Sequence, residues 1–361
     1  MKIAISAAET SGDLIGAKLV AALKAQNPDI QIQGLVGDKM IDAGCVQVWD
    51  QKRVNVMGFS EVLKKLPALW RLRHTIIQYF SKHRPDVFIG VDAPDFNFVI
   101  ERKLKQQGVK TVHFISPSVW AWRQNRIKKI KKSTDLVLCL FPFEVDFYQK
   151  HQQRAVFVGH PLAEVLQPRI NYQRTKKILL MPGSRTSEVT RLLPEMLAAV
   201  AVMAKQDPQL NFHLALANDE LLAWAKPLAR AAGVGVSTGD AHQRMPQADL
   251  VLVASGTAAL ELALLGVPMV VVYKLSALSY FIASRLVKIE WVSLPNIIAK
   301  KSLVPELIQE EAYGANIAQY ALAILQGDIE VLTQEFKKIH QQLALNASEE
   351  SARIIGEFVN E

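Results

Sequence analysis

Two segments in the second half of the chain combine an apolar run, a small polar turn and residues that can start a helix. They are Ile178–Arg185, which ends in Pro-Gly-Ser-Arg, and Leu250–Glu261, which contains Ser-Gly-Thr. In an α/β fold, such a turn places a helix N-terminus at the carboxyl end of a strand, where free N–H groups and the helix dipole attract anions. Glu261 lies four residues after Thr257, on the same helix face, and a carboxylate there can accept hydrogen bonds from two ribose hydroxyls. The pattern predicts a nucleotide-diphosphate site, although ordinary βα turns of a parallel sheet share it.

The first of these turns also carries a cation. Arg185 directly follows Gly183 and Ser184, and a guanidinium in that position can neutralise charge on a diphosphate as a nucleotide leaves. No Asp-x-Asp sequence occurs in the chain, so the usual carboxylate pair of a metal-dependent glycosyl transfer is missing. We therefore expect positive charge and helix dipoles to stabilise the leaving group, and we expect neither a metal nor a cofactor.

Acidic residues follow apolar runs in the first half of the chain as well. Glu9 comes directly after the first run and has no obvious structural role there, whereas Ser11 is equally explained as a helix cap. Asp92 ends the run Val87–Val91, and a carboxylate in that position is costly unless it is hydrogen-bonded or functional. Asp92 is therefore a candidate general base for a hydroxyl nucleophile. Asp95 precedes a helical segment, so it too can be a cap.

Three further places carry side chains that could contact a substrate. Trp120 and Trp122 lie in the loop-like segment Ser116–Arg123, where they could stack on a sugar, cover an acyl chain or form a small hydrophobic cluster. His160 lies where the chain leaves the first domain and is either a site residue or a hinge residue. Asn296 ends a polar turn and could read a substrate hydroxyl or amide.

The stretch Val56–Phe80 mixes apolar and basic residues and is broken by Pro67. This composition suits an amphipathic helix that lies in the interface of a bilayer. A helix that faces the protein core would show the same periodicity, so both interpretations stay open. The apolar residues that would contact acyl chains or lipid are Met57, Phe59, Val62, Leu63, Leu66, Leu69 and Trp70.

Composition limits the class of protein. Of the 361 residues, 50% are hydrophobic and 21% are charged, which is typical of a globular chain, and the length favours two domains. The net charge of +8 fits an anionic partner, but the basic residues do not form the aromatic-interleaved surface of a single-strand nucleic-acid binder. Cys45 and Cys139 lie in apolar surroundings, as buried reduced thiols of a cytoplasmic protein do. No uncharged stretch reaches the roughly 20 residues of a membrane-spanning helix.

Short apolar runs alternate with helical segments along most of the chain, which indicates an α/β protein with doubly wound parallel sheets. Pro161–Lys177 is polar and predicts an interdomain linker, and the chain from about Pro305 predicts amphipathic helices. Ligands of such sheets bind at the carboxyl ends of the strands, which would line a cleft between the domains. The runs expected as strands are Ile3–Ala7, Ile32–Val36, Val87–Val91, Thr111–Ile115, Leu136–Leu140 and Val156–Val158 in a first sheet, and Ile178–Met181, Phe212–Leu216, Val234–Ser237, Leu250–Val253 and Met269–Tyr273 in a second.

Together, these motifs resemble those of the lipid-A-disaccharide synthases. The resemblance follows the family's order of motifs and spans nearly the whole chain. Ala8 stands where the family commonly has glycine, which slightly changes the backbone freedom of that loop. The matching segments are Glu9–Asp13, Val56–Gly58, Asp92–Asn97, Ser116–Arg123, Gly159–His160, Pro182–Arg185, Ala254–Glu261 and Val292–Asn296.

The resemblance implies a GT-B fold, in which two Rossmann-like domains face a cleft. Residues 1–165 would form the acceptor and membrane-facing domain, a C-terminal helix at about 340–361 would pack back on it, and residues 175–340 would bind the UDP-sugar. The implied enzyme is an inverting, metal-independent hexosyltransferase on the cytoplasmic face of the inner membrane, and its C-terminal helix could exchange between the protomers of a homodimer. The alternatives are an isomerase like UDP-N-acetylglucosamine 2-epimerase and a membrane-surface module that binds nucleotide sugars.

The implied reaction condenses UDP-2,3-diacylglucosamine with 2,3-diacylglucosamine 1-phosphate to give UDP and a β-1,6-linked disaccharide 1-phosphate. In that reaction Asp92 would take the proton from the acceptor 6-hydroxyl, Glu9 would orient a sugar or support Asp92, and Arg185 would offset charge on the leaving group. The residues expected at the donor are Gly183, Ser184, Arg185, Ser255, Gly256, Thr257, Glu261 and Asn296, and those expected at the acceptor also include Ser11, Asp95, Trp120, Trp122 and His160.

Overall fold

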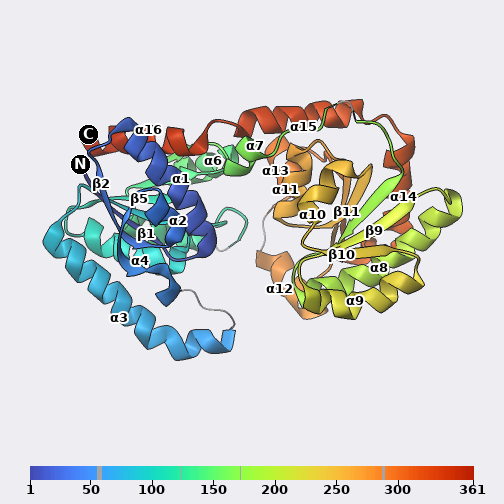
Figure 1. Ribbon diagram of the computed structural model, residues 1–361, viewed down its shortest axis with the longest axis horizontal. Coiled ribbons are helices and arrows are strands. Elements are labelled where there is room, and N and C mark those ends of the chain that lie inside the picture. Colours follow the sequence, from blue (N-terminus) through green and yellow to red (C-terminus); the bar gives the residue numbers. More distant parts are fainter. Residues whose placement is uncertain (55–58, 123, 171, 287–288) are drawn as a thin grey trace. The chain divides into compact units, whose positions relative to one another are not determined.

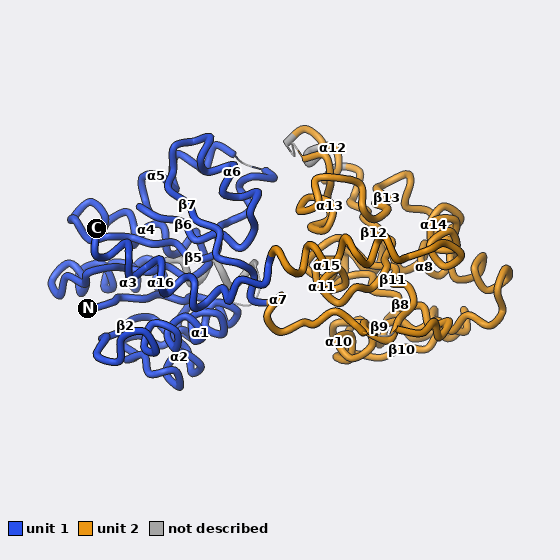
Figure 2. Tube along the Cα trace, turned by 90° about the horizontal axis from the view of Figure 1, so that it is seen from above, with its two compact units in different colours: residues 1–161, 343–361 blue, residues 162–342 orange. Residues whose placement is uncertain are grey.

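The chain forms two compact units, shown in different colours in Figure 2. The first comprises Met1–Pro161 and Leu343–Glu361, and the second comprises Leu162–Gln342. The computed structural model describes residues 1–54, 59–122, 124–170, 172–286 and 289–361, except for the side chains of 59–66, 278, 282, 283 and 286. None of the helices in these residues is long and apolar enough to cross a membrane.

The first unit contains a seven-stranded parallel sheet in the order β3-β2-β1-β4-β5-β6-β7. The chain order reverses between β1 and β4, and ligands of doubly wound sheets bind at such a position, beyond the carboxyl ends of the strands. Strand β3 was not predicted from the sequence, because it is an edge strand whose first residues are exposed and do not form an apolar run. The strands are β1 (Lys2–Ala7), β2 (Gln31–Val36), β3 (Val46–Asp50), β4 (Val87–Val91), β5 (Lys110–Phe114), β6 (Leu136–Cys139) and β7 (Ala155–Phe157).

Helices cover both faces of this sheet, because successive strand residues point to opposite sides. Ile3 and Ile5 of β1 pack in one buried cluster with residues of α1 and α16, whereas Ala4 packs in another with residues of α3 and α4. Figure 1 shows α16, in red, returning to lie beside α1. The helices of this unit are α1 (Thr10–Gln26), α2 (Asp38–Asp42), α3 (Phe59–His83), α4 (Pro94–Lys105), α5 (Ile127–Ser133), α6 (Pro142–Lys150) and α16 (Ala347–Asn360), with 3-10 turns η1 (Gln51–Arg53) and η2 (Gln124–Arg126).

Helix α3 continues through Pro67, so the predicted break at this residue is wrong. A proline removes one backbone hydrogen bond, which can bend a helix without ending it. Leu72 is buried against the sheet, Leu69 is half-buried, and Trp70 is 66% exposed, so the described part of α3 has both a core-facing and an exposed apolar side. Of the other residues predicted to contact lipid, Met57 lies outside the described residues, as do the side chains of Phe59, Val62, Leu63 and Leu66.

The second unit contains a six-stranded parallel sheet in the order β10-β9-β8-β11-β12-β13, and its chain order reverses between β8 and β11. The two predicted doubly wound sheets are thus confirmed. The sequence predicted only helices from about Pro305 onward, and strand β13 in this part of the chain shows that this prediction is wrong. The strands are β8 (Lys177–Met181), β9 (Asn211–Leu216), β10 (Gly235–Thr238), β11 (Leu250–Ala254), β12 (Met269–Tyr273) and β13 (Glu306–Ile308).

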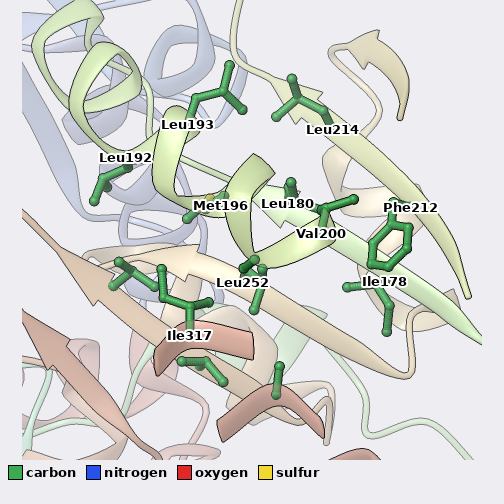
Figure 3. Close-up of a cluster of buried hydrophobic side chains, with 14 of the residues drawn as sticks. Ile178, Leu180, Leu192, Leu193, Met196, Val200, Phe212, Leu214, Leu252 and Ile317 are labelled. Carbon is green, nitrogen blue, oxygen red and sulfur yellow. The ribbon is translucent and has the colours of Figure 1, made fainter. Parts of the chain in front are cut away.

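The core of the second unit lies between the sheet and the helices α8 and α14. Figure 3 shows Leu180 of β8 beside Met196 and Val200 of α8 and Ile178 beside Phe212 of β9, and Ile317 of α14 belongs to the same cluster. This packing anchors the strands whose carboxyl ends carry the predicted turns. The helices of this unit are α7 (Pro161–Val165), which begins at the boundary, α8 (Thr186–Gln206), α9 (Asp219–Ala231), α10 (Ala241–Arg244), α11 (Thr257–Leu264), α12 (Ala277–Leu286), α13 (Leu294–Ala299), α14 (Gly314–Gln326) and α15 (Glu330–Leu343), with 3-10 turns η3 (Met245–Gln247) and η4 (Gln309–Glu311).

Much of the segment predicted as a linker is fixed to the second unit. Arg169 donates hydrogen bonds to the carbonyl oxygens of Ala248 and, through its backbone N–H, Leu265. The carboxylate of Asp249 accepts hydrogen bonds from the Tyr172 hydroxyl and from the backbone of Thr175. These donors offset the free-energy cost of burying the charge of Asp249, and they fix the segment to the second unit.

Candidate functional site

A pocket of about 340 Å³ lies at the carboxyl ends of β8, β9 and β11 in the second unit. It is lined by the turn Gly183–Arg185, by the turn Ser255–Thr257 and by Ala241 at the start of α10. The structure therefore brings the two predicted turns together at the position where the chain order of the sheet reverses. Helices α8 and α11 both begin at this pocket, directly after Arg185 and Gly256, so their N-terminal N–H groups favour an anion there.

Glu188, which the sequence analysis did not identify, shapes the first turn. Its carboxylate accepts hydrogen bonds from the backbone N–H groups of Ser184 and Arg185, each at 3.3 Å. It also accepts a 2.6 Å hydrogen bond from Nη1 of Arg185, whose side chain is 77% exposed. Such an exposed ion pair contributes about 1 kcal/mol or less, so the guanidinium can leave Glu188 for a diphosphate at little cost.

Glu261 lies one turn beyond Thr257 on α11 and is mostly buried, although it is not among the described residues that line the pocket. Its Oε2 lies 3.2 Å from Nδ1 of His242, the residue after the pocket residue Ala241. Burial raises the pKa of Glu261, and the nearby His242 opposes this shift. Oε2 is buried away from solvent and faces His242, and it accepts no hydrogen bond from the described part of the chain. His242 was not predicted.

Asn296 is fully buried in α13 and is surrounded by protein groups. Its amide N–H groups donate to the Val304 carbonyl at 2.9 Å and to Glu306 at 2.8 Å, and its oxygen accepts from the backbone of Leu303 and Val304. These four bonds use the whole hydrogen-bonding capacity of an amide. The structure therefore gives Asn296 a bracing position in place of the predicted contact with a substrate group.

Glu306, another residue that was not predicted, connects this brace to the pocket. Its carboxylate accepts hydrogen bonds from the backbone of Val292 and Ser293 and from the Ser293 hydroxyl. The carbonyl oxygen of Val292 in turn accepts a 3.1 Å hydrogen bond from the hydroxyl of Ser255 in the pocket lining. Asn296 thus helps to hold the second turn through Glu306.

In the first unit, Asp92 lies in a strained loop at the carboxyl end of β4. Asp92 and Ala93 have φ values of +50° and +43°, a left-handed conformation that costs free energy for residues with a Cβ. The buried Asn97 holds this loop, because its amide donates a 2.8 Å hydrogen bond to the Asp92 carbonyl and its oxygen accepts one from the Ser6 hydroxyl. The Asp92 side chain is half-buried. Strain that is held in this way is typical of functional loops.

Glu9 and Asp92 come close together because β1 and β4 are neighbours, with Ala7 paired to Val91. Partial burial and then the negative charge of Asp92 raise the pKa of Glu9. The structure therefore brings the two carboxylates predicted at the acceptor to one sheet edge.

The helix-capping alternatives for Ser11 and Asp95 are wrong. Glu9 is the N-cap of α1 and Ala93 is the N-cap of α4, so both predicted caps lie inside the first turn. Ser11 is exposed. Asp95 has a 77% exposed side chain that forms an ion pair with Arg126.

Trp120 and Trp122 differ in their surroundings. Trp120 is half-buried and its ring lies edge-on to Phe143 at 4.7 Å, in an aromatic row that continues through Phe141 to His160. Trp122 is 41% exposed. Arg123, which ends the predicted motif, lies outside the described residues. Trp120 therefore fits the predicted hydrophobic cluster, whereas the side chain of Trp122 is partly exposed to solvent.

His160 is 8% exposed, and burial lowers the pKa of its imidazole to about 4. The folded protein keeps this ring neutral between about pH 6.5 and 4, while the unfolded chain takes up a proton. Stability is therefore lost as the pH falls through this window, by about 3 kcal/mol at pH 4. We expect His160→Gln to remove this part of the acid sensitivity in urea unfolding of the full chain at several pH values.

The matched control is His74→Gln, which replaces an exposed ring on α3. The quantity to compare is the difference in unfolding free energy between each variant and the parent as a function of pH. A difference for His160→Gln that stays constant from pH 7.5 to 4.5 would show that the buried ring does not control acid sensitivity.

Among the described residues, no three His, Cys, Asp or Glu side chains are grouped so as to hold a metal ion. Cys45 and Cys139 are buried free thiols, as predicted. His113 is a buried core histidine, with Nδ1 at 2.7 Å from the buried Glu101.

The family model described as lipid-A-disaccharide synthetase matches residues 3–355. The lipid-A-disaccharide synthase of Methylobacillus flagellatus is 40% identical over 374 aligned positions, which cover 99% of each chain. Two solved structures resemble the fold: UDP-GlcNAc 2-epimerase from Neisseria meningitidis bound to UDP-GlcNAc (TM-score 0.65, 13% identity, 99% of each chain) and MurG from Acinetobacter baumannii (TM-score 0.59, 13% identity, 99% of each chain). At these identities the structural likeness shows the fold alone, and it confirms the predicted GT-B class with two parallel Rossmann-like sheets.

Proposed function

The chain belongs to the lipid-A-disaccharide synthetase family and is a glycosyltransferase with lipid-A-disaccharide synthase activity, and on this premise we propose which residues carry the transfer. The donor is UDP-2,3-diacylglucosamine and the acceptor is 2,3-diacylglucosamine 1-phosphate. The acceptor 6-hydroxyl displaces UDP with inversion and forms a β-1,6 linkage. The family assignment also decides against the isomerase considered above, because the likeness to the epimerase extends to the fold alone.

The observation that carries the donor half is the pocket of the second unit. Two helix N-termini and Arg185 meet there, and this combination suits a diphosphate. In the proposed complex the diphosphate lies against Gly183, Ser184, Ser255, Gly256 and Thr257. Glu261 accepts hydrogen bonds from the ribose, and Arg185 turns from Glu188 to the leaving phosphate. Asn296 supports this site through Glu306.

The acceptor half rests on the edge of the first sheet where Asp92 and Glu9 lie together. Asp92 accepts the proton of the 6-hydroxyl as that oxygen attacks, because a positioned carboxylate can act as a general base. Glu9 orients the sugar or supports Asp92. The other side chains assigned to the acceptor are Ser11, Asp95, Trp120, Trp122 and His160.

Peripheral attachment to the cytoplasmic face of the inner membrane is the last part of this assignment. It is supported by the net charge of +8, which favours an anionic surface, and by the exposed Trp70 on α3. The acyl chains of the substrates would contact the same helix. A homodimer that exchanges the C-terminal helix is part of the same assignment.

The test is a product assay with the two acylated substrates, in which we expect disaccharide 1-phosphate and UDP in equal amounts. A chelator should not lower the rate, because Arg185 and the two helix N-termini supply the positive charge at the diphosphate. Glu261→Gln should raise the donor KM about tenfold or more, since it removes a charged acceptor of hydrogen bonds. Products are followed by mass spectrometry, and the linkage is read by NMR.

Glu220→Gln is the control, because Glu220 is an exposed residue of α9 in the same unit. Its donor KM should equal that of the parent. Formation of UDP without disaccharide would contradict the transfer reaction. A rate that depends on added metal would contradict metal independence. An unchanged donor KM in Glu261→Gln would contradict the contact between Glu261 and the ribose.

A further inference from the structure

Asn97 is a buried polar residue of the first unit that no proposed step uses. It lies in α4, one turn after Ala93, and its side chain is fully buried. It also ends the segment Asp92–Asn97, in which only the two aspartates have been given a role in the transfer. Burying an amide group costs free energy unless its N–H groups and its oxygen are hydrogen-bonded. The partners of this side chain therefore indicate what it does.

The amide nitrogen of Asn97 is surrounded by backbone carbonyl oxygens. Nδ2 lies 2.8 Å from the oxygen of Asp92 and 3.2 Å from the oxygens of both Val91 and Ser6. The amide oxygen accepts a 2.8 Å hydrogen bond from the Ser6 hydroxyl. Only a donor fits among several carbonyl oxygens, so these surroundings fix the direction in which the amide points. One side chain thus connects the end of β1 with the end of β4.

Gly90 allows this side chain to come so close to the sheet. It lies opposite Ser6 in the pairing of β1 with β4. A Cβ atom at position 90 would lie 2.9 Å from Cβ of Asn97 and 2.1 Å from Oε1 of Glu101, both on α4. Because carbon atoms pack best at about 3.5–4.0 Å, a side chain at this position would push α4 away from β4. The glycine therefore keeps the short amide of Asn97 within hydrogen-bonding reach of the strand ends.

The backbone that Asn97 holds is unfavourable in itself. Asp92 and Ala93 have φ values of +50° and +43°, and a left-handed conformation costs free energy for each residue with a Cβ. The Asp92 carbonyl belongs to the peptide group between these two residues, so the bond from Nδ2 acts where the strain is. Without this bond, the peptide group could rotate toward an ordinary conformation. The Asp92 side chain would turn with it, since both are attached to the same Cα.

We propose that Asn97 is a positioning residue for the general base: by holding the peptide group between Asp92 and Ala93, it sets the direction of the Asp92 carboxylate. Asn97 is fully buried and acts through the backbone, without contact to either substrate. This inference rests on the proposed role of Asp92 as the base. The nucleotide pocket belongs to the other unit and makes no use of Asn97.

The first variant is Asn97→Ala, which removes the amide and introduces no new polar group. We expect kcat to fall about 10–100-fold, because a displacement of about 1 Å in a reacting group can cost that much. The donor KM and the Kd for UDP should stay within about twofold of the parent values. The measurements are steady-state disaccharide formation and calorimetry with UDP. Asn360→Ala, at an exposed residue of α16 in the same unit, is the control and should leave all these constants unchanged.

A change at position 93 separates positioning from a general loss of structure. Glycine adopts a positive φ without the cost that a Cβ imposes, so Ala93→Gly should favour the native backbone even without Asn97. The quantity to compare is the factor by which Asn97→Ala lowers kcat, measured once with alanine and once with glycine at position 93. We expect this factor to be about two- to fivefold smaller with glycine. An equal or larger factor would mean that the loss comes from the packing of α4, which would overturn the inference.

The Asp92→Asn background tests whether Asn97 acts through the base. In that background Asn97→Ala should lower turnover little further, because both changes disable one group. A loss of full size there would show that Asn97 acts elsewhere. Parent-like turnover of Asp92→Asn itself would refute the base and this inference with it. Normal turnover of folded Asn97→Ala beside an impaired Asp92→Asn would refute the positioning role alone.

Ser6→Ala decides the question if Asn97→Ala does not fold. It removes the hydroxyl that donates to the amide oxygen of Asn97 and leaves the amide itself in place. We expect kcat to fall about threefold or more, in keeping with the loss of one ordinary hydrogen bond, and the Kd for UDP to stay at the parent value. An unchanged kcat in Ser6→Ala would then refute the inference.

Discussion

Replacement of Asp92 by asparagine is expected to lower turnover by about 10²–10⁴-fold, the range that general-base catalysis contributes. An amide has nearly the shape of a carboxylate but cannot take a proton from the acceptor hydroxyl at neutral pH. The hydroxyl would then attack without a base, and only orientation and leaving-group stabilisation would remain. The measurement is the steady-state rate of disaccharide formation at saturating concentrations of both substrates.

The structure explains why this variant should fold. The strained backbone at Asp92 is held by main-chain atoms and by Asn97, whose amide bonds the carbonyl oxygen of Asp92. Asparagine also tolerates a positive φ better than most residues. The Kd for UDP should be unchanged, since the proposed nucleotide site lies in the second unit.

Asp86→Asn is the matched control for this variant. Asp86 lies at the opposite end of β4, where its carboxylate accepts a hydrogen bond from the backbone of Lys2 at 2.7 Å. Its loss should leave turnover near the parent value. Turnover of Asp92→Asn within a few-fold of the parent would exclude Asp92 as the base.

The sheets could be predicted from the sequence because their inner strands are buried on both faces. Runs such as Val87–Val91 and Leu250–Ala254 are apolar throughout, and the pattern needs no tertiary information. The strands that were missed lack this signal. In β3, Val46 is 62% exposed at the sheet edge, and β13 has only three residues, so neither forms a continuous buried run.

The helix starts were harder to predict than the strands. Ser11 and Asp95 are residue types that often cap helices, yet α1 and α4 begin before them, with Glu9 and Ala93 as their caps. A preference for cap residues is local, whereas the position of a helix start also depends on how the preceding strand is held in the sheet. The same tertiary support lets α3 continue through Pro67.

In the candidate site, too, features set by neighbouring residues could be predicted from the sequence, whereas contacts between residues far apart in the sequence could not. The turns at Gly183 and Gly256 could be found because the sequence of a βα turn is local. Their supports could not, because Glu306 is far from Ser255 in the sequence and His242 is far from Glu261. Polar residues that brace a loop and polar residues that bind a ligand look alike in a sequence, and Asn296 is the clearest case.

Arg185→Ala is expected to lower turnover by about 10²–10³-fold, the usual cost of losing one group that stabilises charge in a transition state. The side chain of Arg185 is 77% exposed and its partner is Glu188 in the first turn of α8, so its removal should leave the core intact. Arg230→Ala, at an exposed residue of α9, is the control and should turn over at the parent rate.

The comparison of turnover with UDP affinity tests how Arg185 acts. Negative charge on the leaving phosphate grows as the glycosidic bond to UDP breaks, so a nearby guanidinium stabilises the transition state more than the bound donor. Turnover should therefore fall by a larger factor than the affinity for UDP, measured by calorimetry on the same variant. Equal losses would mean that Arg185 only binds the nucleotide, and an unchanged rate would remove it from the reaction. Arg185→Lys should recover part of the turnover, because an ammonium supplies the charge but not the planar pair of donors that matches a phosphate.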